Sequence, residues 1–82
     1  MPFQPADLQT DRIARGVSLQ QIARATMIGT RYLEAIERGA FHKLPGGVYT
    51  TSYIRQYARA AGCDEAALIA YYREVSATLQ SD

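Results

Sequence analysis

Residues 18–38 read SLQQIARATMIGTRYLEAIER and predict two short helices joined by a tight turn. Ser18 and Gln21 have the spacing of a capping box, in which each side chain satisfies a free backbone amide of the first helical turn. Apolar residues then recur at helical spacing in two blocks. We therefore expect helices over 18–26 and 30–38, and two such helices around a tight turn form a helix-turn-helix.

Three more helices are expected outside this motif, and no strand pattern competes with them. The first carries apolar residues at Leu8, Ile13 and Ala14, and the last has an apolar face that runs to Leu79. Glycines follow several of the expected helix ends, where a left-handed residue commonly stops a helix. The expected helices are 6–15, 18–26, 30–38, 48–61 and 64–79. They predict an all-α, compact, lambda-repressor-like five-helix fold, with residues 1–82 forming a single domain.

The composition argues against a typical DNA-binding, disulfide-bonded or membrane-spanning protein. The 82 residues include nine Lys or Arg and eight Asp or Glu, so the formal net charge is only +1, without the basic excess of a typical DNA-binding domain. The single cysteine, Cys63, excludes an internal disulfide and favours a reducing compartment. No signal peptide and no apolar run of about 18 residues is present. We therefore expect a cytoplasmic chain that makes no membrane contact itself.

No set of residues predicts catalysis. His42 and Cys63 are the only histidine and the only thiol, and they lie far apart in the sequence. Glu34 and Glu37 are expected to form an exposed pair of like charges without a pocket that would raise a pKa. The two glycines of residues 46–47 lack the preceding strand and following Lys-Ser/Thr of a phosphate-binding loop. We expect no enzyme activity, no cofactor and no metal.

The third helix, 30–38, is the one that would enter the DNA major groove. Its candidate DNA-contacting residues are Thr30, Arg31 and Glu34, although the carboxylate of Glu34 would face a dense phosphate field. The four charges of this helix cancel, and intrahelical pairing on a solvated face is expected. The remaining basic residues of the first half, which would form at most a weak phosphate-holding surface, are Arg12, Arg15, Arg24 and Lys43. Binding to DNA stays open as an alternative.

The fourth helix carries tyrosines at four-residue intervals, Tyr49, Tyr53 and Tyr57. At about 100° per residue, Tyr57 falls near the expected buried face, while Tyr49 and Tyr53 fall at its edge as a stacked pair. A large aromatic side chain far from the core commonly belongs to an interface, which is the interpretation we favour for Tyr49. Arg55 is either a polar rim to that interface or an ordinary solubilising charge. The expected buried face consists of Ile54, Ala58 and Ala61.

Two pairs of segments carry a family resemblance. Residues 16–23, GVSLQQIA, and 32–39, YLEAIERG, resemble the Cro/repressor-type helix-turn-helix superfamily. Residues 41–49, FHKLPGGVY, followed by 53–59, YIRQYAR, resemble the cytoplasmic domain of the RodZ family. The resemblance covers nearly the whole chain and is weakest before residue 16.

The RodZ resemblance implies a function. In that family the aromatics matching Tyr49 and Tyr53 dock onto MreB, a bacterial actin homologue, in the control of cell shape. The family pattern continues into a basic stretch and a membrane helix, so a longer relative of this chain would sit at the cytoplasmic face of the inner membrane. The alternative is a helix-turn-helix transcriptional regulator, and a third possibility is homodimerisation through Tyr71, Tyr72 and Val75 of the last helix.

Overall fold

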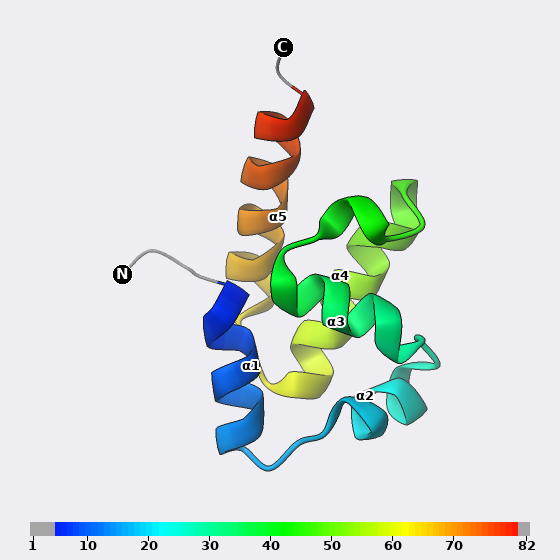
Figure 1. The fold of residues 1–82 in the computed structure, drawn as a ribbon, viewed down its shortest axis with the longest axis vertical. Helices are drawn as coiled ribbons and strands as arrows, with labels where there is room; N and C mark the ends of the chain where they lie inside the picture. Colours follow the sequence, from blue (N-terminus) through cyan, green and yellow to red (C-terminus); the bar gives the residue numbers. More distant parts are fainter. Residues whose placement is uncertain (1–4, 81–82) are drawn as a thin grey trace.

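The computed structural model describes residues 5–80 of the chain, with side chains from residue 7 to residue 77. This part of the chain contains five α-helices, one short 3-10 helix and no strand (Figure 1). The expected all-α class is therefore confirmed, and each predicted helix is present to within one residue at either end. The elements are α1 (Pro5–Ala14), α2 (Leu19–Thr26), α3 (Thr30–Arg38), η1 (Phe41–Lys43), α4 (Gly47–Ala61) and α5 (Glu65–Gln80).

The helix ends follow from local hydrogen bonding. Ser18 caps α2 as predicted: its Oγ accepts a bond from the Gln21 amide over 3.1 Å, and its own amide donates to Gln21 Oε1 over 2.7 Å. Helices α3 and α4 end at left-handed Gly39 and Gly62. Helix α2 ends at Met27 in the same conformation, with a φ of 62° that glycine would adopt at less cost.

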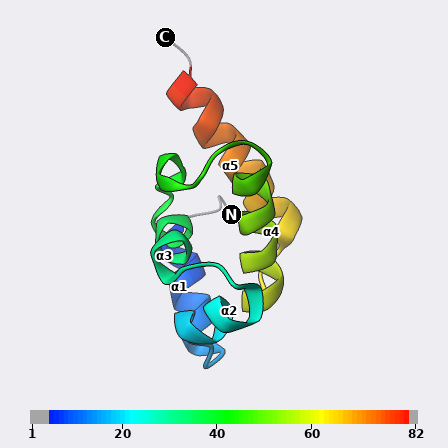
Figure 2. The same ribbon diagram turned by 90° about the vertical axis from the view of Figure 1, so that its right-hand side faces the viewer.

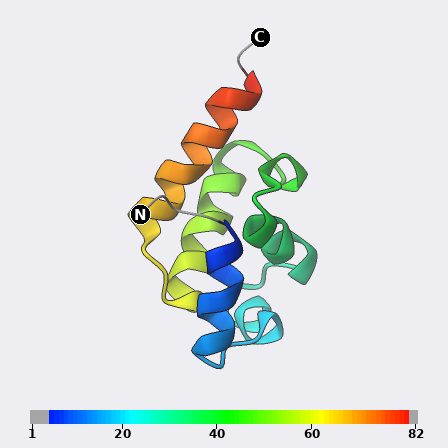
Figure 3. The same ribbon diagram turned by 60° about the vertical axis from the view of Figure 1, so that its left-hand side comes forward.

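The helices pack around one apolar core. Helix α5 lies along α4, α1 packs against α3, and α2 closes one end against both α3 and α4 (Figures 1 and 2). Helix α5 runs beyond the other helices towards the C-terminus (Figure 3). The largest side chains that are fully buried are Leu8, Ile22, Leu33, Ile36, Ile54, Tyr57 and Leu68.

The first helix differs from its prediction. Ile13 is 60% exposed and Ala14 is also exposed, whereas α1 faces the core with Leu8 and Arg12. The expectation was wrong because Ile13 follows Leu8 by five residues, which turns it about 140° away from the buried side at 100° per residue. The predicted inner position of Leu79 lies outside the described side chains. None of the helices within residues 5–80 is long and apolar enough to cross a bilayer.

Candidate functional site

Three polar side chains from α1, α3 and α4 meet inside the molecule. Arg12 Nε donates to Glu37 Oε2 over 2.6 Å, Arg12 Nη2 donates to Glu37 Oε1 over 3.3 Å, and the Tyr57 hydroxyl donates to Glu37 Oε2 over 2.6 Å. Arg12 and Glu37 are 8% and 7% exposed, and Tyr57 is fully buried. This cluster, hereafter the buried triad, ties the helix-turn-helix to the tyrosine helix α4.

The expectation of an exposed Glu34–Glu37 pair is therefore wrong for Glu37. The hydrogen bond to Glu37 raises the pKa of Arg12. The pKa of Tyr57 is raised mainly by its burial, and further by its hydrogen bond to the Glu37 carboxylate. A sequence signal for the triad exists. Arg12 follows the buried Leu8 by four residues and Glu37 follows Leu33 by four, so opposite charges occupy the inward faces of two helices.

Two of the basic residues expected on a phosphate-holding surface make internal contacts instead. Arg12 belongs to the buried triad, and Arg15 donates to the carbonyl oxygens of Ala61 and Gly62 at the end of α4. A Cβ at position 62 would require the end of the flexible Arg15 side chain to move, and the left-handed backbone at this position favours glycine. Of the basic residues grouped in that prediction, Arg15, Arg24 and Lys43 are exposed, and Arg12 is buried.

The outer face of α3 carries the candidate DNA-contacting residues. Arg31 and Glu34 are exposed and Thr30 is half-buried. The Arg31 guanidinium lies 4.7 Å from the centre of the Tyr32 ring, and its Nη2 donates to the Tyr32 hydroxyl over 3.0 Å. Within residues 5–80 no ion pair joins Arg31 to Glu34, so the expected intrahelical pairing is wrong. The neighbouring aromatic ring, which attracts a guanidinium face, holds Arg31 instead.

The tyrosines of α4 have three different environments. Tyr57 is in the core, as predicted. Tyr53 is half-buried, and its ring packs on Tyr32 of α3 with centroids 5.6 Å apart and planes tilted by 56°, so the expected stacking on Tyr49 is replaced by a contact between helices. Tyr49 is 63% exposed, and the neighbouring Val48, which the sequence reasoning did not single out, is 77% exposed.

Arg55 lies on the opposite flank of α4 from the tyrosines. Arg55 follows Tyr53 by two positions, which places the two side chains about 160° apart around the helix at 100° per residue. Its Nε is 3.8 Å from Glu65 Oε1 at the start of α5. The structure therefore places Tyr53 in contact with Tyr32 of α3, and Arg55 near Glu65 at the start of α5.

The residues considered for catalysis or metal binding lie apart along the fold. His42 is exposed in η1, and Cys63 is half-buried after α4, where burial raises the pKa of its thiol. Among the side chains the structure describes, no group of three His, Cys, Asp or Glu residues is arranged to hold a metal ion.

Comparison with known proteins places the chain in a family. A family model described as a helix-turn-helix domain matches residues 7–68. The chain is 44% identical over 48 residues to the "Uncharacterized membrane protein YmfM" of Bacillus subtilis, an alignment that covers 58% of this chain and 17% of that protein. It is 35% identical over 65 residues to the "Cytoskeleton protein RodZ" of Streptococcus pneumoniae, which covers 79% of this chain and 24% of RodZ.

The aligned regions thus span at most 24% of these relatives' lengths. No solved structure gives a significant match. The expected resemblance is nevertheless confirmed, because the helix-turn-helix model covers α1 through the first turn of α5 and the alignment with RodZ covers 79% of this chain. The chain belongs to the helix-turn-helix domain family and is a RodZ-like member of it.

Proposed function

We propose that this domain is a non-enzymatic adaptor that docks onto a bacterial actin of the MreB type. The side chain that would enter the partner is Tyr49, with Tyr53 beside it. The name of the pneumococcal relative, a cytoskeleton protein, supports a cytoskeletal partner. The relative described as a membrane protein supports a place for the domain at the cytoplasmic face of a membrane, within a longer protein.

The observation that carries this proposal is the exposure of Tyr49 on a rigidly held helix. Tyr49 is 63% exposed, while the next residue, Thr50, is buried and its Oγ1 accepts a hydrogen bond from the Gly46 amide over 2.8 Å. This bond fixes the backbone of the first turn of α4, from which Tyr49 projects. Tyrosine is enriched among the hot spots of protein interfaces, and a fixed backbone leaves less freedom to be lost on binding.

Binding to DNA is the second candidate function, and the family itself favours it. Arg31, Arg38 and Lys43 surround a hollow of about 170 Å³ on the outer side of α3, where a phosphate would find three cations. Glu34 lines the same hollow and Arg31 is held by Tyr32, and both features weaken attraction to a polyanion. We therefore rank this function below actin docking.

The test is co-sedimentation of the domain with polymerised bacterial actin. We expect Tyr49→Ala to weaken binding by about tenfold or more, as for a hot-spot aromatic, with an unchanged unfolding midpoint. Val48→Ala is the matched control, since Val48 is equally exposed but turned about 100° around α4. Equal binding by the parent and Tyr49→Ala, together with DNA binding that Arg31→Ala abolishes, would favour the regulator instead.

A further inference from the structure

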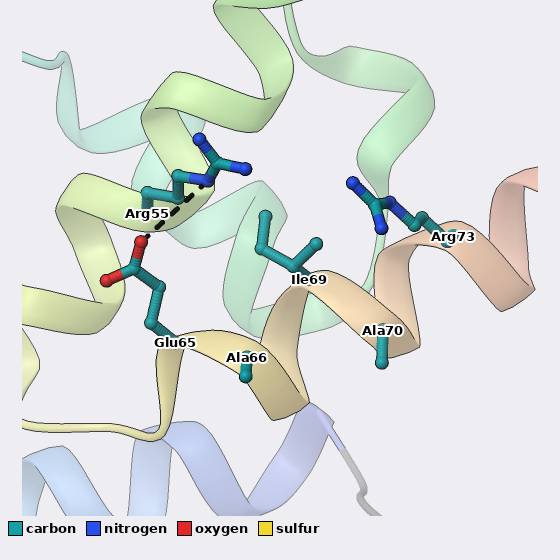
Figure 4. Close-up of a pocket in the computed structure, with 6 residues that line it drawn as sticks. All are labelled: Arg55, Glu65, Ala66, Ile69, Ala70 and Arg73. Atoms are coloured by element: carbon teal, nitrogen blue, oxygen red, sulfur yellow. Dashed lines mark ion pairs between the residues drawn. The ribbon is translucent and has the colours of Figure 1, made fainter.

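A groove runs along α5 beside α4, on the flank of α4 that carries Arg55. It has a volume of about 470 Å³ and is lined by Arg55, Glu65, Ala66, Ile69, Ala70 and Arg73 (Figure 4). The guanidinium groups of Arg55 and Arg73 lie on either side of the Ile69 side chain, with the two alanines along α5 (Figure 4). The groove therefore combines an apolar floor with cationic walls.

The positive charge of this groove is incompletely neutralised. Glu65 forms an ion pair with Arg59, whose Nε and Nη2 donate to the two carboxylate oxygens over 2.9 and 3.3 Å. Arg55 reaches the same carboxylate only at 3.8 Å, with a side chain that is 50% exposed, and such a contact contributes little. Arg73 makes no hydrogen bond or ion pair with any other residue that the structure describes, and Glu74, which follows it, does not line the groove.

The groove concentrates two arginines, Arg55 and Arg73, against one glutamate, Glu65, and that glutamate pairs with Arg59 outside the groove. Such a concentration attracts an anionic partner and orients it during encounter. Arg55 lies about 120° around α4 from Tyr49, so the groove opens on a different face of the helix from that exposed tyrosine.

The apolar floor of the groove determines which kind of anionic ligand fits it. Ile69 is at the bottom, and Ala66 and Ala70 carry side chains small enough for another chain to approach the α5 backbone closely. Val48, 77% exposed, lies two helical turns before Arg55 on the same side of α4 and extends the apolar surface along the helix. An elongated ligand with an apolar edge and flanking negative charges fits this surface better than a compact ion such as phosphate.

We infer that the groove between α4 and α5 is a second docking site, which takes an acidic amphipathic segment of a partner protein. A branched aliphatic side chain of the segment lies on Ile69 between the two alanines. Carboxylates on either side of it pair with Arg55 and Arg73. This site differs from the proposed actin contact, because its lining residues lie on α5 and on the face of α4 that carries Arg55.

The test uses a short synthetic helical peptide with leucine along one edge and glutamate on both flanks. We expect saturable shifts in the amide NMR signals of Ala66, Ile69, Ala70 and Arg73 on titration. Arg55→Gln combined with Arg73→Gln should weaken binding about five- to tenfold, as expected for the loss of two exposed charge pairs. Ala70→Glu should abolish binding, since the new carboxylate lies one turn from Arg73 and repels the peptide.

Matched controls distinguish binding in the groove from non-specific attraction of an acidic peptide to exposed basic side chains. The double variant Arg24→Gln, Arg38→Gln removes the same charge from exposed positions elsewhere and should leave the affinity unchanged. A peptide with glutamine in place of glutamate should bind at least fivefold more weakly. The inference is overturned if no saturable binding occurs, if the control variant weakens binding equally, or if the shifts map to Tyr49. It is also overturned if only anionic phospholipid vesicles bind in an Arg73-dependent way.

Discussion

Replacing Glu37 by leucine tests the energetic role of the buried triad most directly. The carboxylate accepts three hydrogen bonds, two of them from the Arg12 guanidinium, and both partners of the ion pair are less than 10% exposed. Removing one partner of a buried ion pair typically destabilises a protein by about 3–5 kcal/mol, because the other charge is left without compensation. We expect Glu37→Leu to cost an amount in this range.

This loss is large for so small a domain. At about 0.05–0.15 kcal/mol per residue, a chain of 82 residues has a free energy of unfolding of about 4–12 kcal/mol. With a urea dependence of about 1 kcal/mol per M, the unfolding midpoint should fall by about 3 M or more. Far-UV circular dichroism during urea titration measures this shift, and Glu34→Leu on the exposed face of α3 is the control, with an expected change within about 0.5 kcal/mol.

A compensating variant tests the cause. Changing Arg12→Met, Glu37→Leu and Tyr57→Phe together removes every polar group of the triad, and among their partners that the structure describes only the Val17 carbonyl, which accepts from Arg12 Nη1 over 3.0 Å, loses a hydrogen bond. Apolar replacement of a buried ion pair is often neutral or stabilising, so the triple variant should recover to within about 2 kcal/mol of the parent. The reasoning is refuted if Glu37→Leu costs less than about 1 kcal/mol, or if the triple variant is no more stable than Glu37→Leu alone.

Three further predictions concern the helix ends and the response to pH. The pKa of Tyr57 is raised in the folded state, so its stabilisation is complete below the unfolded value of about 10 and is lost as pH rises above it. The test uses a Cys63→Ser background, in which no thiol titrates in this pH range. There the urea midpoint should decrease as the pH is raised beyond about 10, and Tyr57→Phe should make this decrease smaller; an equal decrease with and without Tyr57→Phe would contradict this. Met27→Gly should stabilise the domain by about 0.5–1 kcal/mol, because it relieves a left-handed non-glycine residue; a lower thermal midpoint would contradict this. Ser18→Ala should cost about 1 kcal/mol in urea unfolding through loss of the capping box, and an unchanged midpoint would show that the cap is dispensable.

Much of the fold could be predicted because its signals are local. The capping box at Ser18, the glycines at 39 and 62 and the apolar spacing in α3 and α4 each depend on residues within a few positions of one another. Such interactions are visible in one stretch of sequence. The bounds of all five helices were accordingly predicted to within one residue.

The internal polar contacts could not be predicted in the same way, because they join distant positions. Arg12 and Glu37 are 25 residues apart, and Arg15 reaches the carbonyl of Gly62 across 47. The spacing from Leu8 and Leu33 turns Arg12 and Glu37 towards the core, but nothing near either residue in the sequence identifies the other as its partner. For Tyr53 the angular position on α4 was correctly at the core edge, but its ring partner, Tyr32, comes from another helix.

These contacts also connect the two functions considered for the domain. Arg31 lies over the ring of Tyr32, and Tyr32 packs on Tyr53, so a continuous series of side chains joins the outer face of α3 to the tyrosine flank of α4. A partner that displaced Tyr32 on engaging Tyr53 would deprive the Arg31 guanidinium of the ring and the hydroxyl that it contacts. A phosphate that draws Arg31 away from Tyr32 removes one side of the packing that supports Tyr53. One residue proposed to contact DNA, Arg31, and one proposed to dock onto actin, Tyr53, are therefore connected through Tyr32, and we expect the two proposed functions to exclude each other at these side chains.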